Sequence, residues 1–318
     1  MKAAVVHDFS APPRYDEFPS PTPAAGETLV QVRAAALSQL AKAQAAGRHY
    51  SSGKTLPLVP GVDGVGLLPD GRRVYFSFPR KGYGSMAELS VVATENCVEI
   101  PDDVDDVTAA AIGNPGMSSW IALLERAKFV PGETVLINGA TGTAGQLAIR
   151  IARHLGAARV IATGRNAQRL SELAALGADV TIALDQPAET LTAAFRETLR
   201  EHRVNVVLDY LWGQPAECLL GAVSQGGHAG EPRLRFVQIG AMAGASINLP
   251  GALLRSSGLE LMGSGLGSVS TASIVQAAGE VFRAISNAGL SIEADAVPLT
   301  EVERAWQRED AARLVFTI

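Results

Sequence analysis

The first 115 residues alternate short runs of hydrophobic residues with glycine and proline. This pattern predicts short strands at 3–7, 28–35, 62–67, 73–78 and 86–92. The prolines at 12, 13, 19, 21 and 23 divide the segment between the first two strands into turns, because proline fixes φ and lacks a backbone donor. One alanine-rich helix is predicted at 37–47. We therefore expect an irregular, mostly β domain of the barrel type.

The hydrophobic period changes from residue 118 onward, where a helix is predicted at 118–128. Continuous apolar runs then alternate with segments of helical period. They predict strands at 134–138, 159–163, 180–184, 204–211, 234–239 and 259–263, and helices at 143–155, 167–176, 189–202, 215–224 and 272–287. Such alternation indicates right-handed crossovers and a doubly wound parallel sheet buried on both faces. Strand-like segments at 292–298 and 313–318 could return to the N-terminal domain.

The composition is that of an ordinary globular protein, with 47% hydrophobic and 19% charged residues. The 318 residues suggest about two domains. The net charge of −5 argues against a general nucleic-acid-binding protein, which usually carries a basic face. No apolar run is long enough to span a membrane, and Asp8 interrupts the short apolar N-terminus. We expect a cytoplasmic protein that binds neither a membrane nor a nucleic acid.

A glycine-containing turn joins the predicted strand at 134–138 to the predicted helix that follows. It fits the pattern A-x-G-x-x-G, in which Ala140 replaces the first glycine of the dinucleotide-binding fingerprint. Gly142 would let a pyrophosphate approach the backbone, and Gly145 would let the helix pack on the strand. The free N–H groups of Thr143, Ala144 and Gly145 would then face the phosphates. The alternative is a glycine-rich turn without a ligand.

The residues after the next strand bear on the choice of cofactor. An NAD site usually has an acidic residue there, whereas this chain has Gly164, Arg165 and Asn166. A guanidinium binds a 2′-phosphate that a carboxylate would repel. Arg169 lies one helical turn farther on and could add a second charge. These residues predict NADP(H) as the cofactor, and the alternative for both arginines is an exposed surface side chain.

Several short motifs occur in the order found in one enzyme family. They are the opening residues 1–4, the glycine-rich segment at 60–66, the turns at 71–74 and 84–88, and the segments at 100–102, 109–111 and 114–118. Together they resemble the medium-chain dehydrogenase/reductase superfamily, and within it the zinc-independent quinone oxidoreductase-like branch. The resemblance covers nearly the whole chain. It implies a GroES-like catalytic domain at 1–115, completed by about 290–318, and a Rossmann NADP-binding domain at 116–289.

Departures from the family pattern concern the metal. Where the zinc alcohol dehydrogenases have a cysteine, a histidine and a second cysteine, this chain has Ser38, Val62 and the cysteine-free segment 112–114. The only cysteines are Cys97 and Cys218, too few for a structural zinc site of four cysteines. We therefore expect no metal. Hydride transfer without a Lewis acid suits a quinone or an α,β-unsaturated carbonyl better than an alcohol.

The resemblance also implies which residues surround the nicotinamide. Ser118 matches the family threonine at the start of a helix. The other positions follow the carboxyl ends of the fourth, fifth and sixth strands, where ligands of open α/β sheets bind; they are Tyr210, Leu211, Ile239, Gly240, Ala241, Ser264, Gly265 and Leu266. Leu211, Ile239 and Leu266 could instead be packing residues.

Candidates for the chemistry lie in the first domain. Tyr50 resembles a tyrosine of related enoyl reductases, whose phenol could protonate or stabilise an enolate, although the spacing here is one residue longer. A loop tyrosine without a role is the alternative. Ser38, Gln44 and Tyr83 are candidates for the substrate pocket. Asp63 stands at the position of a family glutamate, and without zinc we expect it to form a structural hydrogen bond.

The sequence thus predicts a zinc-independent, NADPH-dependent oxidoreductase that reduces a quinone or an α,β-unsaturated carbonyl. Two alternatives stay open: a reductase of enoyl thioesters, and a non-catalytic NADPH-binding redox sensor, since a fold does not fix a function. The apolar segment 258–262 would form the edge of the parallel sheet. An exposed edge of this kind invites pairing with another chain, so we expect a homodimer.

Overall fold

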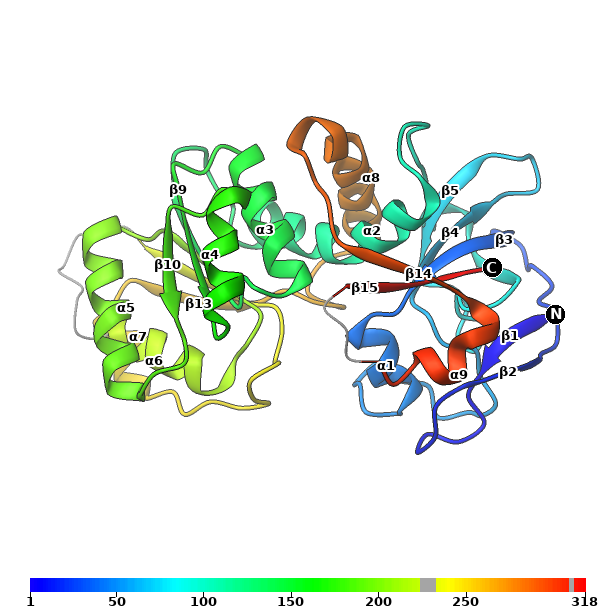
Figure 1. The fold of residues 1–318 in the computed structure, drawn as a ribbon, viewed down its shortest axis with the longest axis horizontal. Coiled ribbons are helices and arrows are strands. Elements are labelled where there is room, and N and C mark those ends of the chain that lie inside the picture. The colour runs from blue at the N-terminus through cyan, green and yellow to red at the C-terminus, as the bar shows by residue number, and fades with distance from the viewer. Residues whose placement is uncertain (224–232, 309–311) are drawn as a thin grey trace. The chain divides into compact units, whose positions relative to one another are not determined.

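The computed structural model describes residues 1–223, 233–308 and 312–318, which form two compact units (Figure 1). The first unit contains residues 1–114, 271–287 and 291–318, and the second contains 115–270 and 288–290. The helix α8 (Thr271–Ala288) therefore groups mainly with the first unit, whereas the sequence analysis placed it in the Rossmann domain. The predicted domain boundaries stay predictions.

The second unit is built on a six-stranded sheet in which every neighbouring pair is parallel. The strands are β8 (Thr134–Asn138), β9 (Arg159–Gly164), β10 (Val180–Ala183), β11 (Val206–Asp209), β12 (Leu234–Gln238) and β13 (Leu259–Gly263). Their order is β10-β9-β8-β11-β12-β13, the arrangement of a Rossmann fold, with a switch point between β8 and β11. The predicted doubly wound sheet is confirmed.

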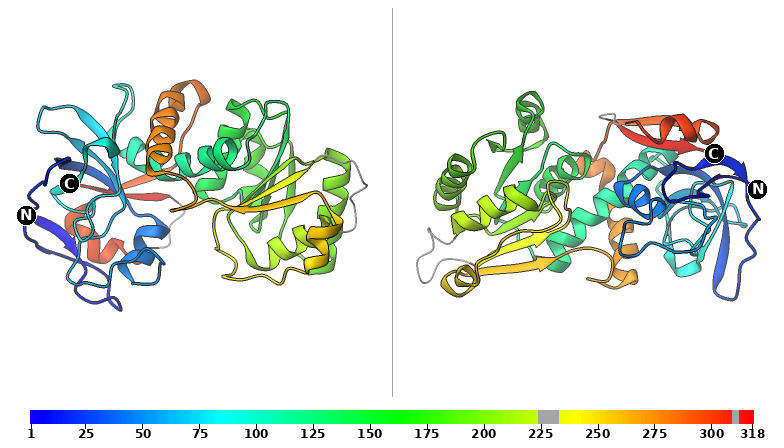
Figure 2. Two further views of the ribbon diagram at one scale, coloured as in Figure 1. Left: turned by 180° about the vertical axis from the view of Figure 1, so that it is seen from behind. Right: turned by 90° about the horizontal axis from the view of Figure 1, so that it is seen from below.

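Helices connect these strands and cover the sheet (Figure 2). They are α3 (Thr143–His154), α4 (Ala167–Leu176), α5 (Ala188–His202), α6 (Gly213–Val223) and α7 (Gly251–Ser256). One core joins Leu136, Val207 and Phe236 of the sheet to Phe195 of α5 and Leu219 of α6. The central strands β8, β9 and β11 are buried almost throughout and carry apolar residues on both faces, so they lack the alternation of an exposed sheet. Residue 224 of the predicted helix 215–224 lies outside the described residues.

The first unit has a mixed seven-stranded sheet and a separate two-stranded sheet. The large sheet contains β3 (Glu27–Ala36), β4 (Asp63–Leu67), β5 (Arg73–Ser77), β6 (Leu89–Ala93), β7 (Cys97–Glu99), β14 (Ala294–Pro298) and β15 (Arg313–Thr317). β15 pairs antiparallel with β3, so both ends of the chain contribute to this sheet. The short helices α1 (Gln39–Ala45) and α9 (Val302–Ala305) complete the unit. The predicted mostly β domain beside a parallel sheet is confirmed.

Several elements differ from the sequence-based expectation: β7, α7 and α9 were not predicted, and one predicted helix starts elsewhere. The helix predicted at 118–128 begins at residue 106 instead: α2 (Asp106–Ile121) continues into a π-helical turn at Ala122–Arg126. Its first turn is capped by Asp105, whose Oδ1 accepts the N–H of Thr108 at 2.9 Å. Pro115 lies inside this helix.

A strand was also missed in the proline-rich N-terminal segment. β2 (Arg14–Glu17) pairs antiparallel with β1 (Lys2–Val5), and Tyr15 stands opposite Ala4. The strand itself contains no proline. Pro12 and Pro13 precede it, and Pro19 follows it. Among the helices that the structure describes, none is both long and apolar enough to cross a bilayer.

Candidate functional site

The turn between β8 and α3 leaves backbone donors available at the N-terminus of the helix. Gly142 is the N-cap, with φ −81° and ψ 162°, and no side chain caps the helix. The N–H groups of Thr143, Ala144 and Gly145 have no acceptor within the helix, since the first intrahelical bond runs from Gln146 to the Gly142 carbonyl at 2.9 Å. Three unpaired N–H groups at the positive end of a helix dipole fit a pyrophosphate.

The glycines of this turn differ in how closely their neighbours approach them. A Cβ on Gly145 would lie 2.5 Å from Ala140 Cα and from the Gly139 carbonyl, so the helix can approach the strand only without a side chain there. A Cβ on Gly142 would meet only the Gly139 carbonyl at 3.7 Å, so Gly142 faces open space. Gly139, which the sequence analysis did not single out, has φ +92° and lies against Leu211.

The end of β9 has no room for the acidic residue of an NAD site. A Cβ on Gly164 would lie 2.3 Å from Thr141 Cγ2 and 2.7 Å from Leu170 Cδ1. Arg165 follows on the surface, and Asn166 caps α4 by accepting the N–H of Arg169 at 3.0 Å. Neither Arg165 nor Arg169 pairs with a carboxylate in the described part of the chain. Both guanidinium groups are therefore available to a phosphate.

A buried hydrogen-bond network joins three strand ends of the second unit. The N–H of Gly139 donates to Thr163 Oγ1 at 3.0 Å, and the Thr163 hydroxyl donates to Asn138 Oδ1 at 2.7 Å. Asn138 Nδ2 donates to Asp209 Oδ1 at 2.8 Å. Asn138, Thr163 and Asp209 are each 0% exposed. The network thus ties the nucleotide turn to β9 and to the turn after β11.

Asp209 shapes the turn that follows β11. Its carboxylate accepts the backbone N–H groups of Leu211 and Trp212, both at 3.1 Å. Burial raises the pKa of Asp209 to about 6, against the effect of these donors, which lower it. The sequence analysis missed Asp209, Asn138 and Thr163. The available signal was a polar residue at the carboxyl end of each buried apolar strand.

The turns after β11 and β12 are held together by backbone hydrogen bonds. The N–H of Ile239 donates to the Asp209 carbonyl, and the N–H of Ala243 to the Leu211 carbonyl, both at 2.7 Å. A Cβ on Gly240 would lie 2.6 Å from the Tyr210 carbonyl, so this contact requires glycine. The Tyr210 hydroxyl bonds Ser119 Oγ at 2.8 Å, and burial raises the pKa of Tyr210.

The predicted nicotinamide residues lie along the carboxyl edge of the sheet. Tyr210 and Leu211 follow β11, Ile239, Gly240 and Ala241 follow β12, and Ser264, Gly265 and Leu266 follow β13. Ser118 lies half-buried inside α2 and not at a helix start, and its neighbour Ser119 is the residue that bonds Tyr210. That these residues bind the cofactor stays a prediction.

The predicted chemical residues lie in the first unit, close to α1. Tyr50 is 75% exposed and its ring lies on that of His49, with ring centroids 4.1 Å apart. Gln44 Nε2 donates to Ser51 Oγ at 2.8 Å, and His49 Nδ1 lies 2.7 Å from the same hydroxyl. Burial lowers the pKa of His49. The structure thus brings Gln44 to the segment that carries Tyr50.

The other two predicted pocket residues have structural partners. Ser38 is 3% exposed and caps α1, its Oγ accepting the Ala41 N–H at 2.9 Å. Tyr83 packs edge-on against Phe18 with ring centroids 5.5 Å apart, and the Arg80 guanidinium lies 5.8 Å from the Tyr83 ring centre. Their roles at a substrate stay predictions.

Asp63 forms the structural hydrogen bond expected for it. The Tyr75 hydroxyl donates to Asp63 Oδ2 at 2.9 Å, while Oδ1 has no hydrogen-bond partner in the described part of the chain. Burial raises the pKa of Asp63 to about 6, opposed by the charge of Arg313 and by the bond from Tyr75. Burial also raises the pKa of Tyr75.

No three His, Cys, Asp or Glu side chains gather as metal ligands would within residues 1–223, 233–308 and 312–318. At the positions compared with zinc enzymes, Val62 is buried and Ser38 is the helix cap. The absence of a metal stays a prediction, since it rests on the identity of these residues.

Comparisons with known proteins agree with this geometry. Residues 144–282 match the family described as zinc-binding dehydrogenase. A probable NADPH-dependent quinone reductase of Emericella nidulans is 29% identical over 98% of this chain and 97% of its own length. The chloroplastic NADPH-dependent alkenal/one oxidoreductase of Arabidopsis thaliana is 27% identical, over 49% of this chain and 44% of that protein. The quinone oxidoreductase of Thermus thermophilus, whose structure was also solved with NADPH, superimposes with a TM-score of 0.80 at 25% identity, covering all of both chains.

Together, these matches support a place for the chain in the medium-chain dehydrogenase/reductase superfamily. Within this superfamily, the relative that matches along the whole chain and the structure solved with NADPH support an oxidoreductase of the quinone oxidoreductase-like branch. The name of the matching family refers to zinc. At two positions where the zinc alcohol dehydrogenases have a cysteine and a histidine, this chain has Ser38 and Val62. The resemblance inferred from the short motifs is confirmed.

Proposed function

We propose that this oxidoreductase transfers hydride from NADPH to a quinone or an α,β-unsaturated carbonyl without zinc. The observation that carries the proposal is the end of β9, where Gly164 excludes an acidic side chain and Arg165 and Arg169 are available to a phosphate. The protein is NADP(H)-dependent, in agreement with the NADPH-dependent quinone reductase that matches along its whole length.

The second unit would hold the cofactor by two of the cofactor's charged groups, the pyrophosphate and the 2′-phosphate. The N–H groups of Thr143, Ala144 and Gly145 would bind the pyrophosphate, and Arg165 with Arg169 would bind the 2′-phosphate. The edge formed by the turns after β11, β12 and β13 would position the nicotinamide. When bound, NADPH supplies the hydride.

The acceptor must be activated by its own conjugation, because Val62 cannot ligate a metal that would polarise a carbonyl. In a quinone or an enone, hydride adds to an electrophilic atom of the conjugated system, and the electron pair moves to the carbonyl oxygen. One proton then completes the reduction. Tyr50 is our candidate for the donor of that proton, since its phenol lies at the surface of the first unit beside His49 and the Gln44–Ser51 pair.

The proposal is tested by NADPH oxidation with a panel of quinones and enones, run beside enoyl thioesters. We expect turnover with the first two classes, unaffected by chelators, and no stoichiometric zinc by elemental analysis. Preferential turnover of thioesters would favour the enoyl-thioester alternative. NADPH binding without turnover across the panel would favour a sensor. One tightly held zinc ion per chain would contradict the zinc-independent mechanism.

We also propose a homodimer formed along β13. The strand lies at the edge of the sheet, as expected, and Leu261 and Met262 are only partly buried. Pairing with a second copy would satisfy the open backbone groups of that edge. Sedimentation equilibrium should give about twice 33.1 kDa, and Leu261→Pro should shift the protein toward the monomer. A wild-type monomer at micromolar concentration would contradict this. The cytoplasmic location stays a prediction.

A further inference from the structure

Arg126 donates hydrogen bonds to two backbone carbonyls, one at the end of β13 and one shortly after it. It is the last residue of the π-helical turn that follows α2. Its Nε donates to the Gly263 carbonyl at 2.8 Å, and its Nη1 donates to the Ser268 carbonyl at 3.2 Å. Glu125, its neighbour in the chain, pairs with Lys128 instead, and Arg126 forms no ion pair among the residues that the structure describes. Its guanidinium therefore serves the backbone around the end of β13.

The π-helical turn determines where this guanidinium points. The N–H of Ala127 donates to the Ala122 carbonyl, five residues back, at 2.9 Å, whereas an α-helix pairs residues four apart. Each residue of an α-helix turns by about 100°, so the extra residue redirects the side chains at the end of the helix. Turns of this kind are rare and frequently occur at functional sites. The side chain that this turn directs toward β13 is that of Arg126.

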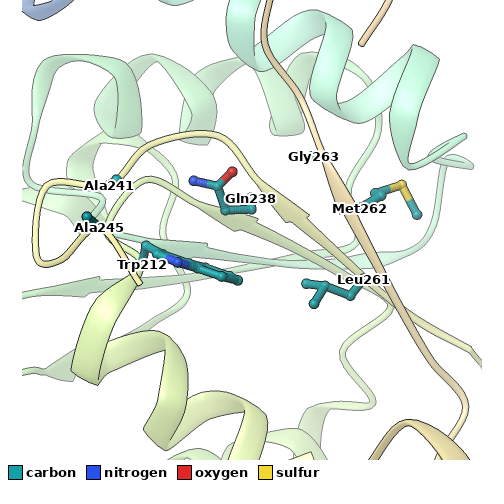
Figure 3. A pocket seen from close by; sticks show the side chains of 7 residues that line it. All are labelled: Trp212, Gln238, Ala241, Ala245, Leu261, Met262 and Gly263. Atoms are coloured by element: carbon teal, nitrogen blue, oxygen red, sulfur yellow. The ribbon is translucent and has the colours of Figure 1, made fainter. Parts of the chain in front are cut away.

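The Gly263 carbonyl lies on the open edge of the parallel sheet. The Ser264 N–H donates to the Gln238 carbonyl of β12 at 2.8 Å. In a trans peptide the carbonyl points opposite to the N–H of the next residue, so the Gly263 carbonyl points away from β12. β13 is the last strand of the sheet, and Figure 3 shows Gly263 beyond Met262 at the end of this strand, where both residues line a hollow. Arg126 thus supplies the donor that a further strand would otherwise give.

The loop 264–268 that follows β13 has little packing to hold it, since none of its residues is buried. Within the loop, Ser268 Oγ accepts the Gly265 N–H at 2.8 Å, and the Ser268 N–H donates to the Gly265 carbonyl at 3.0 Å. Arg126 bonds the residue before the loop and the residue at its end, so it ties the whole loop to the end of α2. The loop contains three of the residues predicted to contact the nicotinamide, namely Ser264, Gly265 and Leu266.

We propose that Arg126 is a positioning residue that holds the loop 264–268 in the conformation that binds the nicotinamide half of NADPH. The proposal rests on the proposed function, to which it adds a residue outside the predicted cofactor contacts. Hydrogen bonds from a charged donor are stronger than neutral ones, and the planar fork of a guanidinium can hold two carbonyls at once. The other half of the cofactor would bind at the turn between β8 and α3 and at Arg165, whereas the hydrogen bonds of Arg126 lead to the loop. Removing the guanidinium should therefore weaken the binding of the nicotinamide half alone.

The test measures, by calorimetry, how the protein binds NADPH and adenosine 2′,5′-bisphosphate, a ligand that has the adenine half of the cofactor but no nicotinamide. Arg126→Met keeps the aliphatic stem and removes the guanidinium. We expect it to lower NADPH affinity about tenfold and to leave the affinity for adenosine 2′,5′-bisphosphate within about twofold of the wild type. Arg150→Met is the matched control, because it removes a bond to the Gly289 carbonyl at 2.7 Å elsewhere in the second unit. Both affinities of the control should equal those of the wild type.

Ser268→Ala is a second variant, which keeps the proposal testable if Arg126→Met does not fold. It removes the hydroxyl that closes the loop, so it should also weaken NADPH binding and spare adenosine 2′,5′-bisphosphate. The double variant should lose less affinity than the two single losses combined, because both changes act through one loop. The thermal unfolding midpoint reports whether each variant is intact.

Equal losses for the two ligands in Arg126→Met would overturn the proposal, and so would wild-type affinity for NADPH in that variant. A selective loss that appears only where sedimentation shows a changed oligomeric state would assign Arg126 to the subunit edge and would also overturn it. The proposed function fails separately: if the wild type reduces no quinone or enone yet Arg126→Met loses NADPH affinity selectively, the positioning role stands and the reaction does not. If quinones are reduced and Arg126→Met binds NADPH as the wild type does, the reaction stands and the positioning role does not.

Discussion

Each unit buries one aspartate whose pKa is raised to about 6 by burial, Asp63 in the first unit and Asp209 in the second. Their partners differ. Asp209 accepts hydrogen bonds from Asn138, Leu211 and Trp212, two of them from backbone N–H groups. Asp63 accepts one bond, from Tyr75, and its other oxygen has no hydrogen-bond partner in the described part of the chain.

This difference separates a carboxylate that builds a site from one that packs in a core. The bonds to Asp209 fix a turn and link it to the nucleotide turn through Asn138 and Thr163. Asp63 stands where zinc enzymes of the family have a glutamate, but its only bond is to a tyrosine inside its own sheet. Of these two aspartates, it is therefore Asp209 that belongs to a hydrogen-bond network at the proposed cofactor site.

The largest expected effect comes from removing these carboxylates one at a time. Asp209→Ala leaves three donors without this acceptor, one of them buried and two half-buried, so it should lower the free energy of unfolding by about 4 kcal/mol. It should also weaken NADPH binding by about tenfold or more, because the nucleotide turn loses its support. Denaturant titration and calorimetry measure the two effects.

Asp63→Ala is the matched control for cofactor binding. Its hydrogen bond leads only to Tyr75, so NADPH affinity should stay within about twofold of the wild type. Equal losses of NADPH affinity in the two variants would remove the distinction drawn between the two aspartates.

The pH dependence of the free energy of unfolding should report the raised pKa values of both aspartates. Because the folded-state pKa of each is about 6 and the ordinary value is 3.8, the folded state holds a proton that the unfolded state has released. Each group therefore contributes stability in full below about pH 4 and loses it as the pH rises through about 6, by about 3 kcal/mol. Unfolding titrations between pH 4 and 7.5 should show a smaller decline in Asp209→Asn and in Asp63→Asn. A wild-type curve parallel to those of both variants would refute the raised pKa values.

Two glycines of the nucleotide turn separate structural support from cofactor binding in the same way, with smaller expected effects on stability. Gly145→Ala forces a Cβ to within 2.5 Å of the turn backbone at Gly139 and Ala140 and should cost about 2 kcal/mol of stability. Gly142→Ala meets nothing closer than 3.7 Å, so it should keep the thermal midpoint of the wild type and weaken only NADPH binding. If Gly142→Ala binds NADPH normally, the pyrophosphate does not lie at this turn.

The sequence predicted the parts of the fold that depend on local pattern. Continuous apolar runs identified all six parallel strands, and the fingerprint located the turn between β8 and α3. The start of α2 was missed, and the helix accommodates Pro115. β2 was missed because the prolines on both sides of it indicate turns, whereas its pairing with β1 joins residues that are apart in the sequence.

The buried network could not be predicted, because it depends on contacts between residues far apart in the sequence. Asn138 and Asp209 end β8 and β11, Thr163 is the last residue but one of β9, and only the sheet order brings the three together. The left-handed conformation of Trp212 likewise depends on the Asp209 carboxylate and on the turn after β12. Ser118 was predicted, from the family resemblance, to lie near the nicotinamide at the start of a helix, whereas it lies inside α2 and its neighbour Ser119 bonds Tyr210.

The central claim is that the end of β9 selects NADPH, and the ratio of dissociation constants for NADH and NADPH tests it most directly. The wild type should bind NADPH about tenfold or more tightly than NADH, a difference of about 1.4 kcal/mol. Arg165→Ala should remove most of this preference while leaving NADH affinity nearly unchanged, and adding Arg169→Ala shows whether the second guanidinium contributes. Equal affinities for the two cofactors in the wild type, or an unchanged preference after both arginines are removed, would contradict the account.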